Sequence, residues 1–206
     1  MSMSPQMFNS ISFHKTTKPQ QKMSQSPASQ MAAMLSAASG ADMNARNQAQ
    51  AALENAEKTA CGEYMGALIA LMSEPQAPEH LRFIAGTQIK NALGGTSFAI
   101  QDFKKQRWLA LDGNLRIQIK GGLLRLLCDR SPKVAKSAAI AVAKMGEVEL
   151  SAQQWPELCT QLHDNITNST QQAGGDVALA AQVRQFTLNA MGYLCEYLYE
   201  ADVNLE

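Results

Sequence analysis

The sequence predicts an all-α protein built from antiparallel helix pairs that stack side by side as an α-solenoid. Alanine is abundant, with 31 residues against six valines and nine isoleucines, and alanine favours helix because it loses no side-chain entropy there. Apolar residues recur three or four apart, as on one face of a helix. Short breaks rich in proline, glycine and serine separate stretches of 12 to 20 residues. Helix pairs that recur about every 40 residues indicate a repeat architecture.

The first segment, residues 1–40, is expected to be a disordered tail. It contains no Asp or Glu, three lysines and the prolines Pro5, Pro19 and Pro27, and such a composition cannot bury much apolar surface. An acid-free, serine-rich leader is also typical of an organelle transit peptide, although no arginine precedes Arg46. A later methionine as the true start is a third interpretation.

Helical stretches follow one another from about residue 31 onward. The breaks between them lie at 74–78, 94–97, 112–113, 131–132 and 168–175. Between the breaks, single-face apolar stripes run through Leu68, Leu71 and Met72, then Leu81, Ile84, Ala85, Ile89 and Leu93, then Leu123, Leu124, Leu127 and Cys128. Each stripe predicts a helix that buries one side against a neighbour.

The last segment has the clearest pattern. Its apolar seam steps by four, three, four and three residues through Val183, Thr187, Ala190, Leu194 and Tyr197. Asp176 lies just ahead of this stripe, where an N-cap is expected, and Ser131 lies just ahead of the preceding helix with Pro132 at its first position.

Charge is distributed unevenly along a chain whose formal net charge is zero. Residues 103–146 hold ten Lys/Arg against two Asp, a balance of +8, and residues 147–206 hold one Arg against nine Asp/Glu, a balance of −8. Clustered cations can track a phosphate backbone, but only Phe103 and Trp108 interleave with them and the charges spread over three helices. We therefore favour a solvated face or a docking surface for an acidic protein, and predict no nucleic-acid partner.

Side chains that carry catalysis or bind metals are scattered. The four cysteines form no C-x-x-C pair and have no histidine at zinc-ligand spacing, so we expect small buried hydrophobes in a reducing compartment. The three histidines have no acid or nucleophile at catalytic spacing, and no phosphate-loop motif occurs. No apolar run approaches the roughly 20 residues that a bilayer requires. We predict no enzyme activity, no cofactor, no metal and no membrane association.

Four segments occur in a characteristic order. They are R-F-I-A-G-T-Q-I-K-N-A-L at 82–93, Q-R-W-L-A-L-D at 106–112, Q-W-P-E-L at 154–158 with N-I-T-N at 165–168, and T-L-N-A-M-G-Y-L-C at 187–195. The first resembles R-x-x-A-G-x-Q-I-K-N-x-L of the importin beta (karyopherin beta) family, and all four resemble its amino-terminal HEAT repeats. The resemblance implies, for 41–206, a right-handed solenoid of HEAT/armadillo-like repeats, about three complete and the first helix of a fourth. Family members are several times longer, which implies a fragment or a truncated product.

The resemblance implies a nuclear transport receptor that acts in the cytoplasm and nucleus and at the nuclear pore. The amino-terminal repeats of that family bind the small GTPase Ran in its GTP form, whereas importin alpha, cargo and FG nucleoporins dock mostly on repeats absent here. Lys90 and Asn91 match the family's K-N pair, and Arg130 matches an arginine in the turn that opens its third repeat. Lys104 and Lys105 lie in a loop that is also polar in the family. These five residues are the Ran-binding candidates.

Structural interpretations of the same residues stay open beside the functional one. The chain could be an importin-derived helical scaffold without transport activity. Trp108 and Trp155 could pack between helices, Arg107 could pair with Asp112, and polar side chains such as Gln88 could form a ladder between repeats. The end helix at 176–199 would expose apolar surface, so we expect self-association.

Overall fold

The structure, a computed structural model, describes residues 26–203, and all regular structure in this range is helical. The helices are α1 (Pro27–Ala38), α2 (Met43–Thr59), α3 (Cys61–Met72), α4 (Glu79–Leu93), α5 (Phe98–Leu109), α6 (Gly113–Leu126), α7 (Pro132–Ser151), α8 (Leu158–Thr167), α9 (Ser169–Gln172) and α10 (Val177–Val203). The all-α prediction is confirmed.

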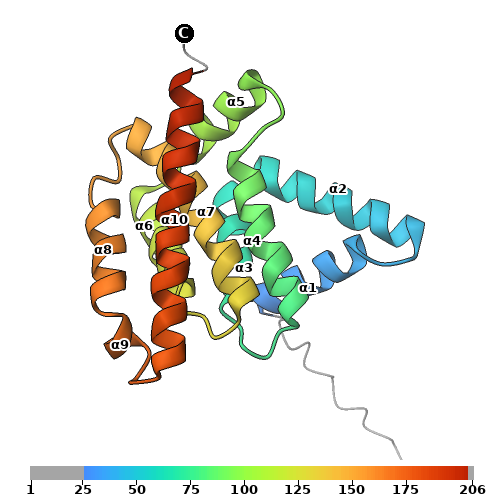
Figure 1. Ribbon diagram of the computed structural model, residues 1–206. Helices are drawn as coiled ribbons and strands as arrows, with labels where there is room; N and C mark the ends of the chain where they lie inside the picture. Colours follow the sequence, from blue (N-terminus) through green and yellow to red (C-terminus); the bar gives the residue numbers. More distant parts are fainter. Residues whose placement is uncertain (1–25, 204–206) are drawn as a thin grey trace, which may run out of the picture.

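Three long helices, α4, α7 and α10, lie side by side in one row (Figure 1). A second row packs behind it, in which α3 is paired with α4, α6 with α7 and α8 with α10. The helix α5 packs on α4, whereas α1 and α2 form a hairpin from which α2 projects away from the body (Figure 1). The molecule is therefore the predicted stack of antiparallel helix pairs.

Two predicted boundaries differ from the structure. Residues 26–40, expected in a disordered tail, contain α1, because Ser26 caps its first turn and Met31 and Leu35 are buried in the core. The remainder of the predicted tail, 1–25, lies outside the described residues. The last helix, α10, packs along α7 and against α8. It is thus the second helix of the pair that α8 begins, whereas we expected the first helix of a further repeat.

The predicted helix starts and the predicted seam are confirmed. The Ser131 hydroxyl accepts a hydrogen bond from the Val134 N–H at 3.3 Å, and the Asp176 carboxylate accepts one from the Leu179 N–H at 3.1 Å. Along α10, the predicted seam residues lie on the side that packs into the protein, with only Tyr197 partly exposed. Local capping chemistry and periodicity therefore predicted these elements correctly.

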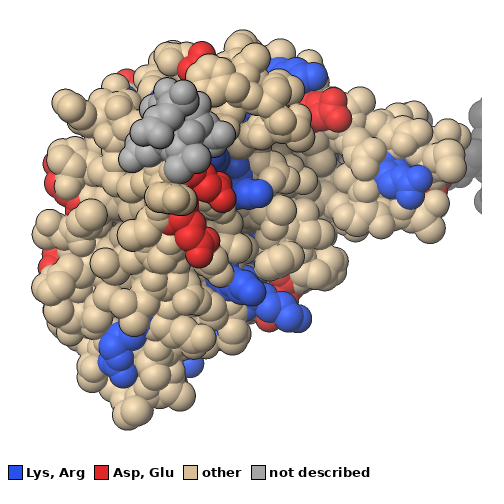
Figure 2. Space-filling model, turned by 45° about the horizontal axis from the view of Figure 1, so that its top comes forward, with Lys and Arg blue, Asp and Glu red and all other residues tan. Residues whose placement is uncertain are grey.

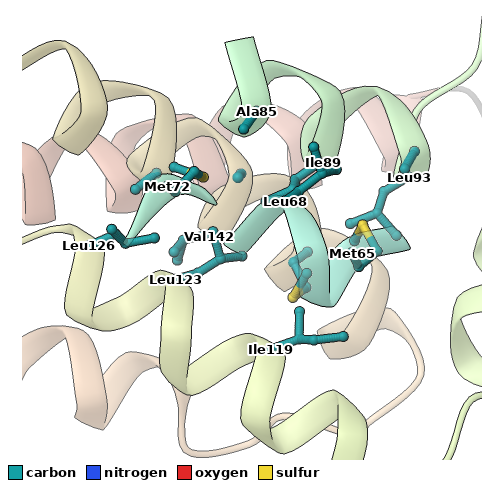
Figure 3. Close-up of a cluster of buried hydrophobic side chains, with 14 of the residues drawn as sticks. Met65, Leu68, Met72, Ala85, Ile89, Leu93, Ile119, Leu123, Leu126 and Val142 are labelled. Atoms are coloured by element: carbon teal, nitrogen blue, oxygen red, sulfur yellow. The ribbon is translucent and has the colours of Figure 1, made fainter. Parts of the chain in front are cut away.

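The core lies between the two rows of helices. Figure 3 shows Met65 and Leu68 of α3, Ile89 of α4, Leu123 of α6 and Val142 of α7 converging, and all are fully buried. The two tryptophans are buried as well, which agrees with the interpretation that they pack between helices.

The helix α7 is surrounded by α4, α6 and α10 and is rich in alanine. Neighbouring helices approach it closely at two glycines. A Cβ atom on Gly86 of α4 would lie 2.4 Å from the Oγ of Ser137, and one on Gly146 of α7 would lie 2.5 Å from a methyl group of Leu158. At Gly86 the Ser137 Cβ would also lie within 2.7 Å, so a larger residue would push α4 and α7 apart, whereas at Gly146 only the flexible end of the Leu158 side chain is that close.

Candidate protein-binding surface

Most basic residues of 103–146 pair with acids inside the molecule. Seven of the ten form ion pairs: Lys104 and Arg107 with Glu57, Arg116 and Lys120 with Glu149, Arg130 with Asp176, Lys133 with Glu79, and Lys144 with Glu147. Among the described residues, the other three, Lys105, Arg125 and Lys136, form no ion pair. The expected open basic face is therefore mostly wrong, because acids distant in sequence lie opposite these cations.

Glu149 is the centre of the most deeply buried of these charge clusters. Its carboxylate accepts hydrogen bonds from the Trp108 Nε1 at 2.9 Å, from the Arg116 Nη1 at 3.1 Å and from the Lys120 Nζ at 2.5 Å. The Lys120 ammonium also lies 4.8 Å from the centre of the Trp155 ring. Because these partners come from α5, α6 and the loop after α7, the cluster holds α7 to three other segments. Its role is structural.

Four of the five candidate residues gather at one end of α4. Lys90 and Asn91 are in its last turn, and the Lys104 ammonium donates to the Asn91 carbonyl oxygen at 2.7 Å. The same ammonium lies 3.1 Å from the Glu57 carboxylate. Lys105 is the next residue on α5 and is partly exposed. Lys104 is therefore held by internal partners, whereas Lys90 and Lys105 form no ion pair among the described residues.

The fifth candidate, Arg130, is separate from the others. It lies in the turn between α6 and α7, where its guanidinium is exposed and 3.7 Å from the Asp176 carboxylate. This turn adjoins the start of α4, because Lys133 lies 2.9 Å from Glu79. Lys90 lies eleven positions after Glu79 on α4, which is about 16 Å along a helix axis.

The structure adds residues that the sequence analysis did not select. The solvent-facing positions of α4 and α7 lie together because Gly86 touches Ser137, which fixes the register of the two helices. They present Phe83, which is 39% exposed, with Thr87, Lys90, Lys133 and Lys136. We call these five residues the α4–α7 surface. Two lysines three residues apart, at the start of an alanine-rich helix, are the sequence signal for its α7 side.

Charges of both signs lie near this region. Figure 2 shows basic and acidic side chains next to one another across the hollow between α10 and the projecting α2 end of the molecule. At the lower edge of the α4–α7 surface, the pKa of the Glu79 carboxyl is lowered by hydrogen bonds from Ser131 and Lys133. An exposed aromatic ring among lysines can bind a protein surface that carries both apolar groups and carboxylates.

The side chains provide no alternative chemistry within the part of the chain that the structure describes. No group of three His, Cys, Asp or Glu residues in 26–203 is arranged to hold a metal. None of the helices described there is long and apolar enough to cross a bilayer.

The four cysteines are free thiols in two different environments. Cys61 is buried, and burial raises the pKa of its thiol. Cys128 is half-buried and donates to the Gln172 side-chain oxygen at 3.2 Å, and burial raises its pKa too. Cys159 and Cys195 are exposed. The expectation that all four are buried is therefore wrong for these two, which lie on the outward sides of α8 and α10.

The chain is similar in sequence to known proteins. It is 33% identical over 155 residues to importin subunit beta-1 of Arabidopsis thaliana and 30% identical over 155 residues to importin subunit beta-1 of Schizosaccharomyces pombe. Each match covers 75% of this chain but 17% of the relative, so the chain spans about a sixth of the length of these relatives. No protein-family model matches the chain.

Solved structures have the same fold. Yeast importin-beta (Kap95p) has a TM-score of 0.73 at 23% identity, covering 82% of this chain and 19% of that chain. A crystal structure of importin beta in an ammonium sulfate condition has a TM-score of 0.71 at 27% identity, covering 81% and 18%. Kap95p in a structure that concerns the switch loops of RanGDP has a TM-score of 0.72 at 23% identity, covering 82% and 19%. The predicted solenoid is thereby confirmed.

Proposed function

The chain belongs to the importin beta family, and on that premise we propose that it forms a Ran-binding part of a nuclear transport receptor. Its relatives are named importin subunit beta-1. Kap95p, which shares the fold, is described as inducing the switch loops of RanGDP to adopt the GTP-bound conformation. The chain spans only 17% of its relatives' length. For this reason transport activity, in the cytoplasm and nucleus and at the nuclear pore, is also stated as a proposal.

The observation that carries the proposal is the α4–α7 surface. Phe83 and Thr87 are exposed there, and Lys90 and Lys136 reach solvent without an ion pair among the described residues. Cations that are free of internal partners can form ion pairs with a bound protein, whereas paired ones must first lose a partner. The mixture of apolar and cationic groups supports a folded protein partner.

The candidate residues take different roles in this proposal. Lys90, Asn91 and Lys105 contact the GTPase directly. Lys104 holds α5 against the end of α4, because its ammonium is bonded to Glu57 and to the Asn91 carbonyl. Arg130 makes a separate contact near the start of α4, where Glu79 lies about 16 Å along the helix axis from Lys90. A partner that touches both ends must be at least that wide, which suits a globular GTPase better than a short peptide.

Selectivity for the GTP form follows from differential contacts. A binding surface can distinguish two states of a partner only by as much as it interacts differently with them. In a small GTPase the γ-phosphate orders the switch segments. We therefore expect the α4–α7 surface to contact a switch segment, so that binding weakens when GDP replaces GTP.

The test is a binding measurement with the full chain. Ran loaded with GDP or with a non-hydrolysable GTP analogue is titrated against the wild-type chain and against Lys90→Glu/Lys136→Glu. We expect GTP-selective binding that the double variant weakens at least about tenfold, or about 1.4 kcal/mol. Arg125→Glu is the matched control, because Arg125 is an exposed cation of α6 without an ion pair among the described residues.

Each outcome has a distinct meaning. No binding to either form, at concentrations where a full-length importin beta binds, contradicts the proposal and favours a helical scaffold without GTPase binding. Binding that Arg125→Glu weakens as much as the double variant does contradicts the assignment to the α4–α7 surface.

A further inference from the structure

An exposed phenylalanine lies within the α4–α7 surface. Phe83 is 39% exposed and does not belong to the buried core, although the nearby α4 residues Leu81 and Ala85 do. In the described part of the chain no cation lies over its ring, whereas the Arg107 guanidinium lies 5.8 Å from the centre of the Phe103 ring. The Phe83 ring therefore contributes little to the interior and is available to a partner.

Neighbouring side chains extend the apolar area around Phe83. Thr87 is exposed one turn further along α4, and its hydroxyl donates to the Phe83 carbonyl oxygen at 3.3 Å, so its methyl group remains for an outside contact. On α7, Ile140 is half-buried and lies outside the core cluster. Because Gly86 touches Ser137, Ile140 lies about one turn beyond that contact and Phe83 about one turn before it. Thr87 lies between these two levels.

Cations border this apolar area. Lys133 and Lys136 lie beside it on α7, and Lys90 lies seven positions after Phe83 on α4, or about 10 Å along the helix axis. Lys90 and Lys136 form no ion pair among the described residues. Protein interfaces commonly have an apolar centre and a polar rim, and a few central aromatic side chains carry most of the binding energy. A cationic rim favours a partner whose own apolar centre is bordered by carboxylates.

The α4–α7 surface is open in the middle of the stack. In the front row, α7 lies between α4 and α10, and α6 packs behind it (Figure 1). A further helix pair is added beside such a row and not in front of it, so more repeats at either end would leave this side of α7 open. The partner that covers the surface must therefore approach from in front of the row.

We propose that Phe83 carries most of the affinity of the α4–α7 surface, by packing against an apolar side chain of the GTPase that is bordered by carboxylates. This inference rests on the proposed function and deepens it, because the five candidates selected by resemblance are all polar or cationic. Burial of the ring slows dissociation. The lysines act on the rate of association, through an attraction that salt screens.

Binding kinetics of the full chain at low and high salt separate these two contributions. With Ran loaded with a non-hydrolysable GTP analogue, we expect Phe83→Ala to weaken binding at least about tenfold at both salt concentrations, through faster dissociation. Phe83→Leu should retain most of the affinity, and the effect of Lys90→Glu/Lys136→Glu should shrink at high salt. Phe98→Ala is the matched control, because Phe98 is 74% exposed on α5 and undergoes the same change. Thermal unfolding shows that the variants are folded.

A tryptophan at this position reports on the contact directly. The chain has two tryptophans, Trp108 and Trp155, which are 0% and 2% exposed. Phe83→Trp therefore adds an indole that acrylamide can reach, and its fluorescence should be quenched in the free chain. After the signal of the wild-type complex is subtracted, we expect bound Ran to protect this indole from acrylamide.

The outcomes distinguish this inference from the proposed function. Equal effects of Phe83→Ala and Phe98→Ala, or an indole at position 83 that stays open to acrylamide in the complex, overturn the role of Phe83 and leave Ran binding intact. Wild-type binding that disappears at high salt also overturns it, because the cations then carry the affinity. Absence of binding to either nucleotide form overturns both.

Discussion

The buried Glu149 cluster predicts a large and specific loss of stability when its charge is removed. Glu149 is fully buried and its two oxygens have different partners: one accepts from Trp108 and Arg116, the other from Lys120 at 2.5 Å. In Glu149→Gln, the amide oxygen can still accept from Trp108 and Arg116. The amide nitrogen then faces the Lys120 ammonium, so two donors meet and a buried cation loses its counterion.

Breaking a buried ion pair by removing one partner costs about 3–5 kcal/mol. We expect Glu149→Gln to lower the free energy of unfolding by about 3 kcal/mol, which for a chain of this length corresponds to roughly 6–12 °C in the unfolding temperature. Urea titration monitored by circular dichroism measures the change.

A second substitution shows whether the unpaired cation causes the loss. Lys120→Met in the Glu149→Gln background removes the ammonium and should restore at least about 1 kcal/mol, a coupling that a double-mutant cycle isolates. A loss below about 1 kcal/mol in the single variant, or strictly additive effects in the cycle, would refute the reasoning.

Three further predictions concern packing, thiol access and pH. Gly86→Ala should destabilise the fold by about 1–3 kcal/mol in urea titration, because its Cβ would lie 2.4 Å from a serine oxygen of α7. The control Gly66→Ala, in open space on α3, should stabilise the fold by up to about 1 kcal/mol. Equal effects of the two substitutions would contradict the close contact. Mass spectrometry of the native chain treated with a maleimide should find Cys159 modified and Cys61 intact until urea unfolds it, because Cys61 is buried and burial raises its thiol pKa; equal rates would argue against this burial. The folded-state pKa of Glu79 is lowered below its ordinary value of 4.5. Its contribution to stability is therefore present above that value and lost as pH falls through the folded pKa. The difference in free energy of unfolding between wild type and Glu79→Gln should thus be larger at pH 7 than at pH 3.

The parts of the fold that depend on local chemistry were predictable from the sequence. Ser131 and Asp176 cap helices because their side chains reach backbone N–H groups three residues away. The same chemistry is present at Ser26 and Pro27, which begin α1. The polar composition of residues 1–40 concealed it, because the burial of Met31 depends on helices that come later in the chain.

Contacts between distant residues were not predictable in the same way. Arg107 has Asp112 nearby in sequence, but the structure pairs it with Glu57, 50 residues away, at 2.9 Å, while Asp112 caps α6. Gln88, expected in a ladder between repeats, accepts a hydrogen bond from Tyr64 of the same helix pair at 3.4 Å. A count of charges over residues 103–146 shows an excess of cations but not which acids pack against them.

The candidate surface likewise combines residues that the sequence could identify with residues that only the fold brings together. Motif resemblance selected Lys90 and Asn91, and the structure brings Lys104 to them through one hydrogen bond. Lys136 could not be selected, because its proximity to α4 follows from the register of two helices about 50 residues apart. The separation of Arg130 from the other candidates has the same cause.

The nearly complete burial of α7 has a consequence for how the chain opens. A helix enclosed by α4, α6 and α10 cannot expose its amides unless at least one of these neighbours detaches first. Amide protons of α7 should therefore exchange with deuterium more slowly than those of α2 and the end of α10, which exchange through local fraying. Helix pairs at the two ends can then open locally without each other, while their shared packing against α7 couples them in global unfolding.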